Sequence, residues 1–285
     1  MKEVTKAVVA VAGSGTRLLP ATKAQPKEML PIIDKPIIQY LVEELVEAGI
    51  QDIIMVTRWD KKPLEDHFDR SFELERSLEK TGKLEKLEEV QHISSMANFI
   101  YVRQKGPYGN GTPLLSVANM IGDEPFVYAF GDDLVKSKVS FTKQLIDLYK
   151  KEQAPMIGVQ EVPEEDVEKY GIVKYHENSI ELEDIIEKPS KEEAPSRHAD
   201  FGRMILNREI VDTLLRTDKG KGNELWIIDA IKKYIDEGGR FLAKEVEDGE
   251  WITTGDPANY LKATLAYAAD CPELQGVLDE YCKNR

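Results

Sequence analysis

An apolar run that ends in a glycine-rich turn constrains the fold of this chain more than any other feature. Residues 7–12 are all alanine or valine, and Gly13-Ser14-Gly15 follows directly. A short continuous apolar run is typical of a strand buried on both faces, as in a sheet with helices on each side. Residues 36–48 then show helical apolar spacing, and residues 51–57 resemble a second strand. The chain is therefore predicted to begin with a βαβ unit.

The alternation of strand-like and helix-like segments continues along the chain. Strand-like apolar runs and helical spacing follow one another at residues 99–103, 112–120, 126–130, 141–151, 156–160 and 201–206. Such alternation is typical of helices packed on both faces of a parallel sheet. We therefore predict an α/β fold with a doubly wound, mostly parallel mixed sheet.

Other segments depart from this alternation. Residues 170–175 and 180–187 flank a turn at Asn178-Ser179 and predict a small antiparallel β subdomain over the carboxyl ends of the sheet. The remaining helical patterns comprise residues 224–235, with Asn223 as their expected cap, residues 257–268, and an amphipathic surface segment at residues 72–90 that Gly82 interrupts.

Composition limits the classes of partner. The 38 lysine and arginine residues and 52 aspartate and glutamate residues give a formal net charge of −14. A surface this acidic repels nucleic acid and anionic membranes, so neither is expected as a partner. No apolar stretch approaches the roughly 20 residues that cross a bilayer, and two cysteines are too few for a disulfide framework. A cytoplasmic location is expected, and a polyanionic substrate would need a local basic cluster or a metal ion.

Such a basic cluster follows the first strand. Gly13-Ser14-Gly15 precedes Thr16 and Arg17, and Lys27 lies ten residues further on. Glycines let backbone N–H groups approach phosphate oxygens that a Cβ would obstruct. A dinucleotide-binding motif would need a third glycine where Leu18 stands, and the P-loop pattern is absent. Nucleotidyl transfer, in which arginine and lysine neutralise a leaving pyrophosphate, fits this loop best.

The loop also resembles that of a known family. Residues 13–31, which end in Pro26-Lys27-Glu28-Met29-Leu30-Pro31, resemble the bacterial and archaeal UTP–glucose-1-phosphate uridylyltransferases, which are sugar nucleotidyltransferases. The resemblance continues in the family's order through residues 34–40, 101–105, 131–133, 170–173, 187–189, 194–196, 202–203 and 260–263. It therefore covers nearly the whole chain.

The resemblance implies an activity and an organisation. We expect transfer of a uridylyl group from UTP to α-D-glucose 1-phosphate, with Mg²⁺ as cofactor, in a Rossmann-like nucleotidyltransferase fold. The 285 residues are expected to form a single domain. Its nucleotide-binding part spans about residues 1–135, its sugar-binding part about 136–265, and a helical tail about 266–285. A homodimer or homotetramer is expected.

The resemblance also implies roles for residues at the nucleotide end. Arg17 is expected to bind the β- and γ-phosphates of UTP, and Lys27 the α-phosphate. Asp132 follows a predicted strand, and its hard carboxylate oxygens suit Mg²⁺. These three are the expected catalytic residues, and Asp132 is the expected metal ligand. The other expected nucleotide-binding residues are Ala12, Gly13, Gly15, Thr16, Gln104, Gly109 and Asp133.

A second group of residues is expected to bind the sugar phosphate. Glu187 would accept hydrogen bonds from sugar hydroxyls, and the Lys188 ammonium would contact the phosphate. Gly171 would let the sugar approach the backbone, and Gly202 with Arg203 would line the same cavity.

The sequence departs from the family at three places. Thr253 stands where many relatives have an aspartate that related enzymes use as a second metal ligand. Trp226 and Asn110 lie in altered segments near the expected pocket. These departures leave open the same chemistry with another sugar 1-phosphate, such as galactose 1-phosphate, or with dTTP. A non-catalytic regulatory subunit that binds nucleotide sugars is a further alternative, against which the retained Arg17 and Lys27 argue.

Overall fold

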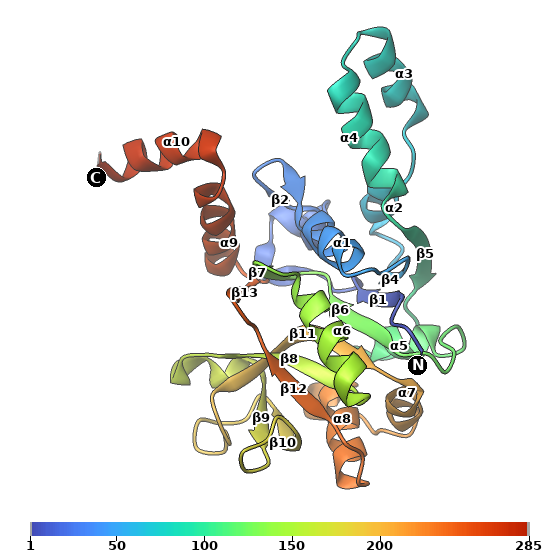
Figure 1. Cartoon of the computed structure of the whole chain (residues 1–285), viewed down its shortest axis with the longest axis vertical. Helices are drawn as coiled ribbons and strands as arrows, with labels where there is room; N and C mark the ends of the chain where they lie inside the picture. Colours follow the sequence, from blue (N-terminus) through green and yellow to red (C-terminus); the bar gives the residue numbers. More distant parts are fainter. Residues whose placement is uncertain (1, 284–285) are drawn as a thin grey trace.

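The computed structural model describes residues 2–283, and its centre is one mixed sheet (Figure 1). The main path of the sheet runs β10-β9-β11-β6-β1-β4-β5, and β8 and β12 extend it from β11. The nine strands are β1 (Lys6–Ala10), β4 (Asp52–Thr57), β5 (Asn98–Arg103), β6 (Phe126–Phe130), β8 (Met156–Glu161), β9 (Gly171–Tyr175), β10 (Leu182–Glu187), β11 (His198–Leu206) and β12 (Leu242–Glu245). Every strand predicted from the sequence lies in this sheet.

The predicted βαβ unit is confirmed. Strands β6, β1, β4 and β5 are parallel neighbours, and Ala7 of β1 pairs with Ile53 on one side and Val127 on the other. Helix α1 (Ile37–Glu47) connects β1 to β4. The carboxyl ends of these strands meet at one edge, where ligands bind in open α/β sheets.

The predicted antiparallel pair is also confirmed, and it continues the main sheet. Ile186 of β10 lies opposite Ile172 of β9, and Ile172 also pairs with Ala199 of β11. Strand β11 runs antiparallel to β6, β8 and β9. The pair therefore forms one edge of the sheet, because its neighbour β11 lies between it and the parallel strands.

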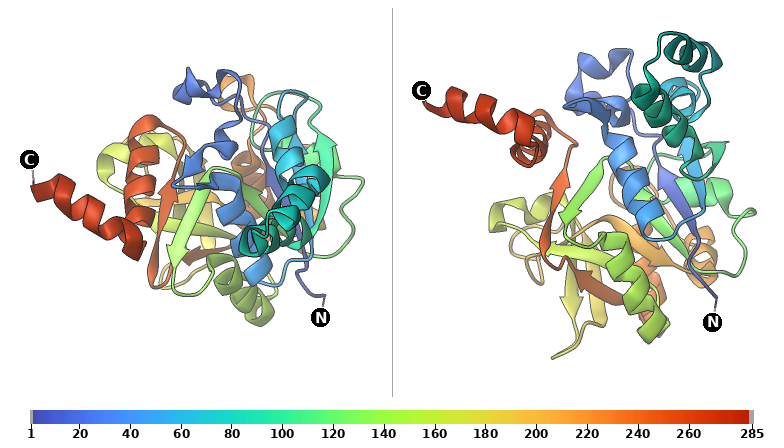
Figure 2. Two further views of the ribbon diagram at one scale, coloured as in Figure 1. Left: turned by 90° about the horizontal axis from the view of Figure 1, so that it is seen from above. Right: turned by 45° about the horizontal axis from the view of Figure 1, so that its top comes forward.

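Two apolar cores lie on opposite faces of the sheet. Successive side chains of a strand point to opposite faces. Val9 of β1 belongs to a core with α1 and α6 (Phe141–Glu152), whereas Val8 belongs to a core with α5 (Thr112–Val117), α7 (Arg208–Leu215) and α8 (Ile227–Asp236). Figure 2 shows helices on both sides of the sheet, which confirms the doubly wound fold.

Helix α8 begins later than predicted. Its expected cap, Asn223, has a φ of +60° and lies outside the helix, which starts at Ile227 after Trp226. The Ile227 N–H donates instead to Oδ1 of Asn110, at 2.9 Å. A side chain from a distant loop thus takes the capping role, which local sequence could not indicate.

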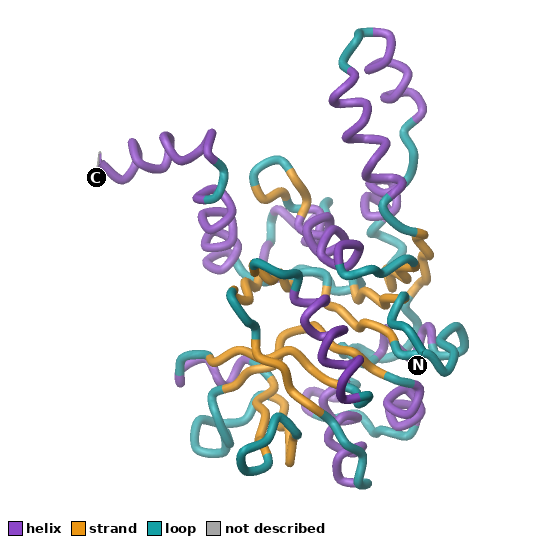
Figure 3. The backbone as a smooth tube through the Cα atoms, viewed as in Figure 1, coloured by secondary structure: helices purple, strands orange, loops and turns teal. Residues whose placement is uncertain are grey.

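Two helical pairs project from the body of the molecule (Figures 1 and 3). After α2 (Lys62–Phe68), the segment predicted as one surface helix forms α3 (Phe72–Lys80) and α4 (Leu84–Ser95), which fold back on each other as a hairpin (Figure 1), with Gly82 at φ +69° in the turn. Near the carboxyl terminus, α9 (Pro257–Ala269) begins where predicted, whereas α10 (Pro272–Lys283) extends sideways from the end of α9 (Figure 1). No helix within residues 2–283 has the length and apolar character needed to span a bilayer.

Two short antiparallel ribbons complete the fold. They pair β2 (Pro31–Ile32) with β3 (Lys35–Pro36), and β7 (Asp133–Ser137) with β13 (Gly249–Thr253). In the second ribbon Thr253 lies opposite Asp133. This pairing brings a segment from late in the chain against the loop that follows β6.

Candidate active site

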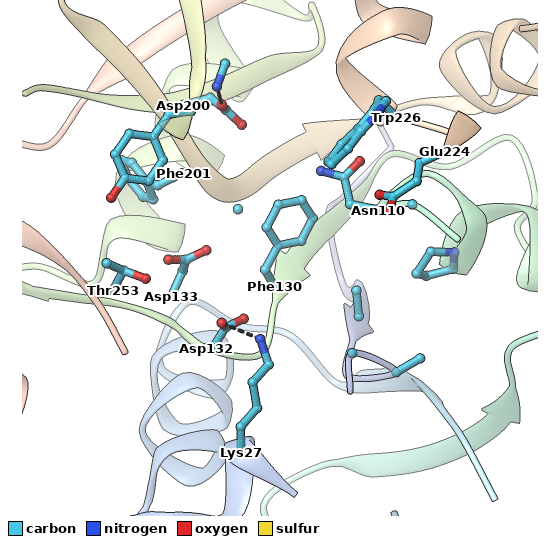
Figure 4. Close-up of a pocket in the computed structure, with 18 of the residues that line it drawn as sticks. Lys27, Asn110, Phe130, Asp132, Asp133, Asp200, Phe201, Glu224, Trp226 and Thr253 are labelled. Atoms are coloured by element: carbon cyan, nitrogen blue, oxygen red, sulfur yellow. Dashed lines mark hydrogen bonds and ion pairs between the residues drawn. The ribbon is translucent and has the colours of Figure 1, made fainter. Parts of the chain in front are cut away.

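A cavity of about 810 Å³ lies beyond the carboxyl ends of β1 and β6, and Figure 4 shows part of it. The expected site residues that line it are Ala12, Gly13, Arg17, Lys27, Gln104, Gly109, Asp132, Asp133, Gly171, Glu187, Lys188 and Gly202. Gly15, Thr16 and Arg203 are not among its lining residues. The fold therefore gathers residues from six separate stretches of chain around one volume.

Gly15 sets the backbone conformation of the glycine-rich loop without lining the cavity. Its φ of +66° is one that residues with a side chain rarely adopt, and its carbonyl accepts a hydrogen bond from Thr22 Oγ1 at 2.7 Å. Gly13 faces the cavity beside Lys27, whose Cε lies 3.5 Å from the position of a Cβ on Gly13. Arg17 is exposed and makes no hydrogen bond or ion pair within residues 2–283. Its guanidinium is therefore available to an anion.

Lys27 and Asp132 form an ion pair at the centre of the cavity (Figure 4). Burial lowers the pKa of Lys27, but the carboxylates of Asp132 and Glu28 outweigh this effect, and the net pKa is raised. Burial raises the pKa of Asp132, but the Lys27 ammonium outweighs it, and the net pKa is lowered. Both side chains are thus charged at neutral pH, ready to separate toward a phosphate and a cation.

A second, fully buried ion pair anchors this loop. Lys61 Nζ lies 2.8 Å and 2.7 Å from the two carboxylate oxygens of Glu28, and both side chains are at most 4% exposed. Glu28 follows Lys27 directly, and Lys61 lies just before α2. The pair therefore fixes the position of the Lys27 backbone against the segment that follows β4.

Gln104 and Gly109 contribute a further part of the cavity lining. Gln104 directly follows β5, and its backbone N–H donates to the Thr57 carbonyl at 2.8 Å. Its side-chain amide has no hydrogen-bond partner in the described part of the chain and faces the cavity. Gly109 has a φ of +124°, and a Cβ there would lie 2.1 Å from the carbonyl oxygen of Leu225. Only glycine fits this position, which forms a flat wall.

Glu187 and Lys188 line the opposite end of the cavity. Lys188 Nζ lies 3.1 Å from Glu187 Oε1 and 4.0 Å from the centre of the Trp226 ring. Trp226 Nε1 donates to the Lys221 carbonyl at 2.8 Å, and Lys221 Nζ donates to the Lys188 carbonyl at 2.9 Å. Trp226 therefore positions the Lys188 ammonium, a role that the sequence did not indicate.

Asp200 and two glycines form the floor beside Glu187. The Gly171 N–H donates to Asp200 Oδ1 at 2.8 Å. A Cβ on Gly202 would lie 2.1 Å from the Phe130 ring, so Gly202 is required for packing against Phe130. Sequence reasoning missed Asp200, although it lies two residues before Gly202 on the same strand, and period two places such residues on one side.

Arg203 does not line the cavity, so its expected contact with the sugar phosphate is corrected. Its side chain is fully buried and lies 2.9 Å from Glu44 Oε2, and it also donates to the Asp133 carbonyl at 3.0 Å. Neighbouring residues on a strand point to opposite faces, so the arginine after Gly202 points into the α1 side. Its hydrogen bond to the Asp133 carbonyl holds the Asp133 backbone from the side away from the cavity.

Asp133 is buried and is fixed by Trp251. Trp251 Nε1 donates to Asp133 Oδ1 at 2.9 Å. Burial, followed by the negative charge of Asp132, raises the pKa of Asp133 to about 6. Trp251 was not predicted at the site, because it reaches Asp133 only through the ribbon of β7 and β13.

Asp132 is the carboxylate best placed to bind a divalent cation. The Lys27 ammonium already lies against it, so the position accepts positive charge. No group of three or more His, Cys, Asp or Glu side chains in the described residues could hold a metal alone. Mg²⁺ commonly takes one or two carboxylates and fills its remaining positions with phosphate oxygens and water. One carboxylate beside the glycine-rich loop therefore fits such an ion.

Comparison with protein families gives one match over most of the chain. The model of a family described as nucleotidyl transferase matches residues 6–270. Among curated proteins, the UTP–glucose-1-phosphate uridylyltransferase YngB of Bacillus subtilis is 44% identical over 286 residues, which cover 99% of this chain and 96% of that protein. A second UTP–glucose-1-phosphate uridylyltransferase of the same organism is 46% identical, with coverage of 98% and 96%.

Solved structures give the same result for the fold. A UDP-glucose pyrophosphorylase in complex with UDP-glucose is 40% identical, with a TM-score of 0.83 over 93% of this chain and 98% of that chain. A UTP-bound pyrophosphorylase of the same kind from Acinetobacter baumannii is 36% identical, with a TM-score of 0.88 over 98% of both chains.

Proposed function

This chain belongs to the nucleotidyl transferase family, and from that premise we propose that it transfers a uridylyl group from UTP to α-D-glucose 1-phosphate, which gives UDP-glucose and pyrophosphate. One cavity with two chemically different ends is the observation that carries this proposal. Its first end has the glycine-rich loop with Arg17 and Lys27, and its second end has Glu187 and Lys188. Such a cavity suits two anionic substrates that must meet between its ends.

We place UTP at the first end. The backbone of Ala12 and Gly13, with Gln104 and Gly109, would surround the uracil, and the Gln104 amide offers both a donor and an acceptor. Arg17 has no partner in the described chain, and so its charge is free for the β- and γ-phosphates. Gly15 and Thr16 would act by shaping the loop, and Asp133 by supporting Asp132.

We place the sugar phosphate at the second end. Lys188 would bind its phosphate, and Glu187 would accept hydrogen bonds from sugar hydroxyls beside Gly171. A phosphate oxygen then attacks the α-phosphorus of UTP in line. The new P–O bond forms as the bond to the bridging oxygen of the β-phosphate breaks, and pyrophosphate leaves. A sugar phosphate is already a nucleophile at pH 7, so alignment and charge stabilisation by Lys27 and Lys188 are the protein's main task.

Enzymes of this family generally use a divalent metal, and we propose Mg²⁺ for this chain. The Asp132 carboxylate would hold it together with phosphate oxygens. When bound, the ion neutralises phosphate charge and orients the triphosphate. Thr253 offers only a hydroxyl, which accepts the Gly255 N–H at 3.4 Å, so a single protein carboxylate suffices in this proposal.

We propose that the chain acts in the cytoplasm as a homodimer or homotetramer, with no nucleic-acid or membrane partner. The net charge of −14 argues against binding of nucleic acid and of anionic membranes. The projecting α3–α4 hairpin, with Phe72, Leu74 and Leu84 exposed, supports a contact between copies. Light scattering on the purified protein would give its mass, and a monomer would contradict the assembly.

The decisive experiment is a pyrophosphate-release assay on a panel of substrates. UTP, dTTP and ATP would each be paired with glucose 1-phosphate and galactose 1-phosphate, with Mg²⁺ or with a chelator. We expect the highest kcat/KM for UTP with glucose 1-phosphate, and loss of activity with the chelator. Binding of UDP-glucose without any pyrophosphate release would instead indicate a non-catalytic regulatory subunit.

A further inference from the structure

The sugar end of the cavity contains a buried carboxyl that the proposed reaction does not use. Asp200 is 7% exposed and lines the cavity. Its Oδ1 accepts the Gly171 N–H at 2.8 Å, and its Oδ2 has no hydrogen-bond partner within residues 2–283. Figure 4 shows the carboxyl pointing toward the interior of the cavity. A carboxyl oxygen that lines a cavity and has no protein partner can form a hydrogen bond with a ligand group.

The charged groups that face Asp200 are mostly negative. They are Glu187 of β10, Asp133 after β6, and Lys188. A Cβ on Gly171 would lie 2.5 Å from Asp200 Oδ1 and 3.4 Å from Glu187 Oε2, so the two carboxyls border the same small volume. Lys188 pairs with Glu187, and no side chain of the described residues forms an ion pair with Asp200.

This arrangement determines which atom of Asp200 carries a proton. Two adjacent carboxyls, of which only one is paired with an ammonium, do not both ionise readily. Burial, followed by the charge of Glu187, raises the pKa of Asp200 well above its usual value. The neutral form of Asp200 is therefore favoured, and its proton belongs on Oδ2, because Oδ1 already accepts the Gly171 N–H. A neutral carboxyl of this kind donates one hydrogen bond.

We propose that Asp200 is a further specificity-determining residue, whose Oδ2–H donates a hydrogen bond to one hydroxyl of the bound sugar while Glu187 accepts from another. This inference rests on the proposed function, since it concerns the sugar subsite of that reaction. A donor and an acceptor side by side fix the orientation of a sugar ring. A sugar without the matching hydroxyl leaves Oδ2 unpaired and binds less well.

Two substitutions separate this role from an ionised or a merely structural one. In Asp200→Asn, the amide oxygen still accepts from Gly171 and the amide N–H₂ still donates to the sugar, so the KM for glucose 1-phosphate should remain within about threefold. In Asp200→Ala, both contacts are lost, and this KM should rise about tenfold or more. The KM for UTP should stay unchanged in both. Asp52→Asn, at the opposite end of the sheet, is the matched control.

The pH dependence provides a second readout. A carboxyl with a raised pKa donates below that pKa and loses its proton as the pH rises through it, so the parent KM for glucose 1-phosphate should increase as the pH rises through the pKa of Asp200. Asp200→Asn removes the titrating group and should abolish this part of the increase. Burial also raises the pKa of Glu187, and the two carboxyls interact, so the difference between the two profiles reports on this pair of groups.

A series of deoxy sugar 1-phosphates identifies the partner hydroxyl. Loss of one particular hydroxyl should raise KM in the parent and have no added effect in Asp200→Ala. The proposal is overturned if Asp200→Asn is as impaired as Asp200→Ala, which would require an ionised carboxylate. It is also overturned if neither variant changes KM, or if no hydroxyl shows coupling to Asp200.

The design separates failure of this inference from failure of the proposed function. If the parent releases no pyrophosphate from UTP and glucose 1-phosphate, the proposed function fails. The Asp200 comparison is then made by calorimetric binding of UDP-glucose, with thermal melting to verify that both variants are folded. Equal affinity of the parent, Asp200→Asn and Asp200→Ala, or no binding by any of them, would overturn the inference.

Discussion

The two ends of the cavity are built in different ways. At the proposed nucleotide end, Lys27 is paired with Asp132 and Lys61 with Glu28 before any ligand arrives, while Arg17 has no partner within residues 2–283. At the proposed sugar end, Lys188 pairs with Glu187 and also lines the cavity, and Asp200 has no ion-pair partner within residues 2–283. We infer a division of roles from this difference. The first end holds charged side chains in place before a substrate binds, whereas polar groups of the second end need a ligand as their hydrogen-bond partner.

The largest expected effect tests the preorganised end through stability. In Lys61→Met, Glu28 remains buried without its cation, and loss of one partner of a buried pair costs about 3–5 kcal/mol in the free energy of unfolding. Denaturant unfolding measures this cost. Lys62→Met, one residue later in an exposed pair, should change stability by less than about 0.5 kcal/mol.

A double variant sharpens the same test. Glu28→Gln combined with Lys61→Met removes both charges, so part of the stability lost in Lys61→Met should return. If Lys61→Met alone unfolds at the same denaturant concentration as the parent, the buried pair does not anchor the loop.

The next effect concerns catalysis at the same end. Lys27→Ala removes an ammonium from the expected position of the α-phosphate, and one such charge contact is worth about 2–3 kcal/mol, or about a 30- to 150-fold fall in kcat. The KM for UTP should change less. Lys23→Ala, an exposed lysine of the same loop outside the cavity lining, is the control. An unchanged kcat would remove Lys27 from the transition state.

The comparison also explains what could be predicted from sequence. The residues of the nucleotide end follow strands directly, in residues 11–17, 104 and 131–133, so a correct strand prediction places them at one edge. Most of the sheet and the expected lining of this end therefore followed from local patterns and from the resemblance. Gly15 and Thr16 were expected at the nucleotide, but neither lines the cavity.

The sugar end depends on contacts that no local pattern contains. Arg203 was expected in the cavity from the resemblance to the family, but strand alternation turns it toward Glu44. Asp200 and Trp226 reach the cavity only through the pairing of β11 and the start of α8. Such placements depend on tertiary register, which a single sequence does not specify.

A smaller effect, on the KM for glucose 1-phosphate, is expected when the Glu187 carboxylate loses its charge. Glu187→Gln keeps the shape and one acceptor but loses charge-assisted hydrogen bonds to the sugar, so the KM for glucose 1-phosphate should rise about tenfold with little change in the KM for UTP. Glu183→Gln, an exposed residue of the same strand paired with Lys174, is the control. If Glu187→Gln leaves the KM for glucose 1-phosphate unchanged, the two ends of the cavity do not differ as described.

The smallest effect tests how Lys188 is positioned. The Trp226 ring lies 4.0 Å from the Lys188 ammonium, and a cation–π contact at a partly exposed site is worth about 0.5–1 kcal/mol. Trp226→Leu should therefore raise the KM for glucose 1-phosphate about two- to fivefold, and Trp226→Phe, which keeps a ring, should recover part of the loss. Trp59→Leu, at a tryptophan that is 85% exposed and outside the cavity lining, is the matched control. If Leu and Phe behave alike, the ring does not act through Lys188, and the hydrogen bond from Trp226 Nε1 to the Lys221 carbonyl, which both variants lose, becomes the better explanation.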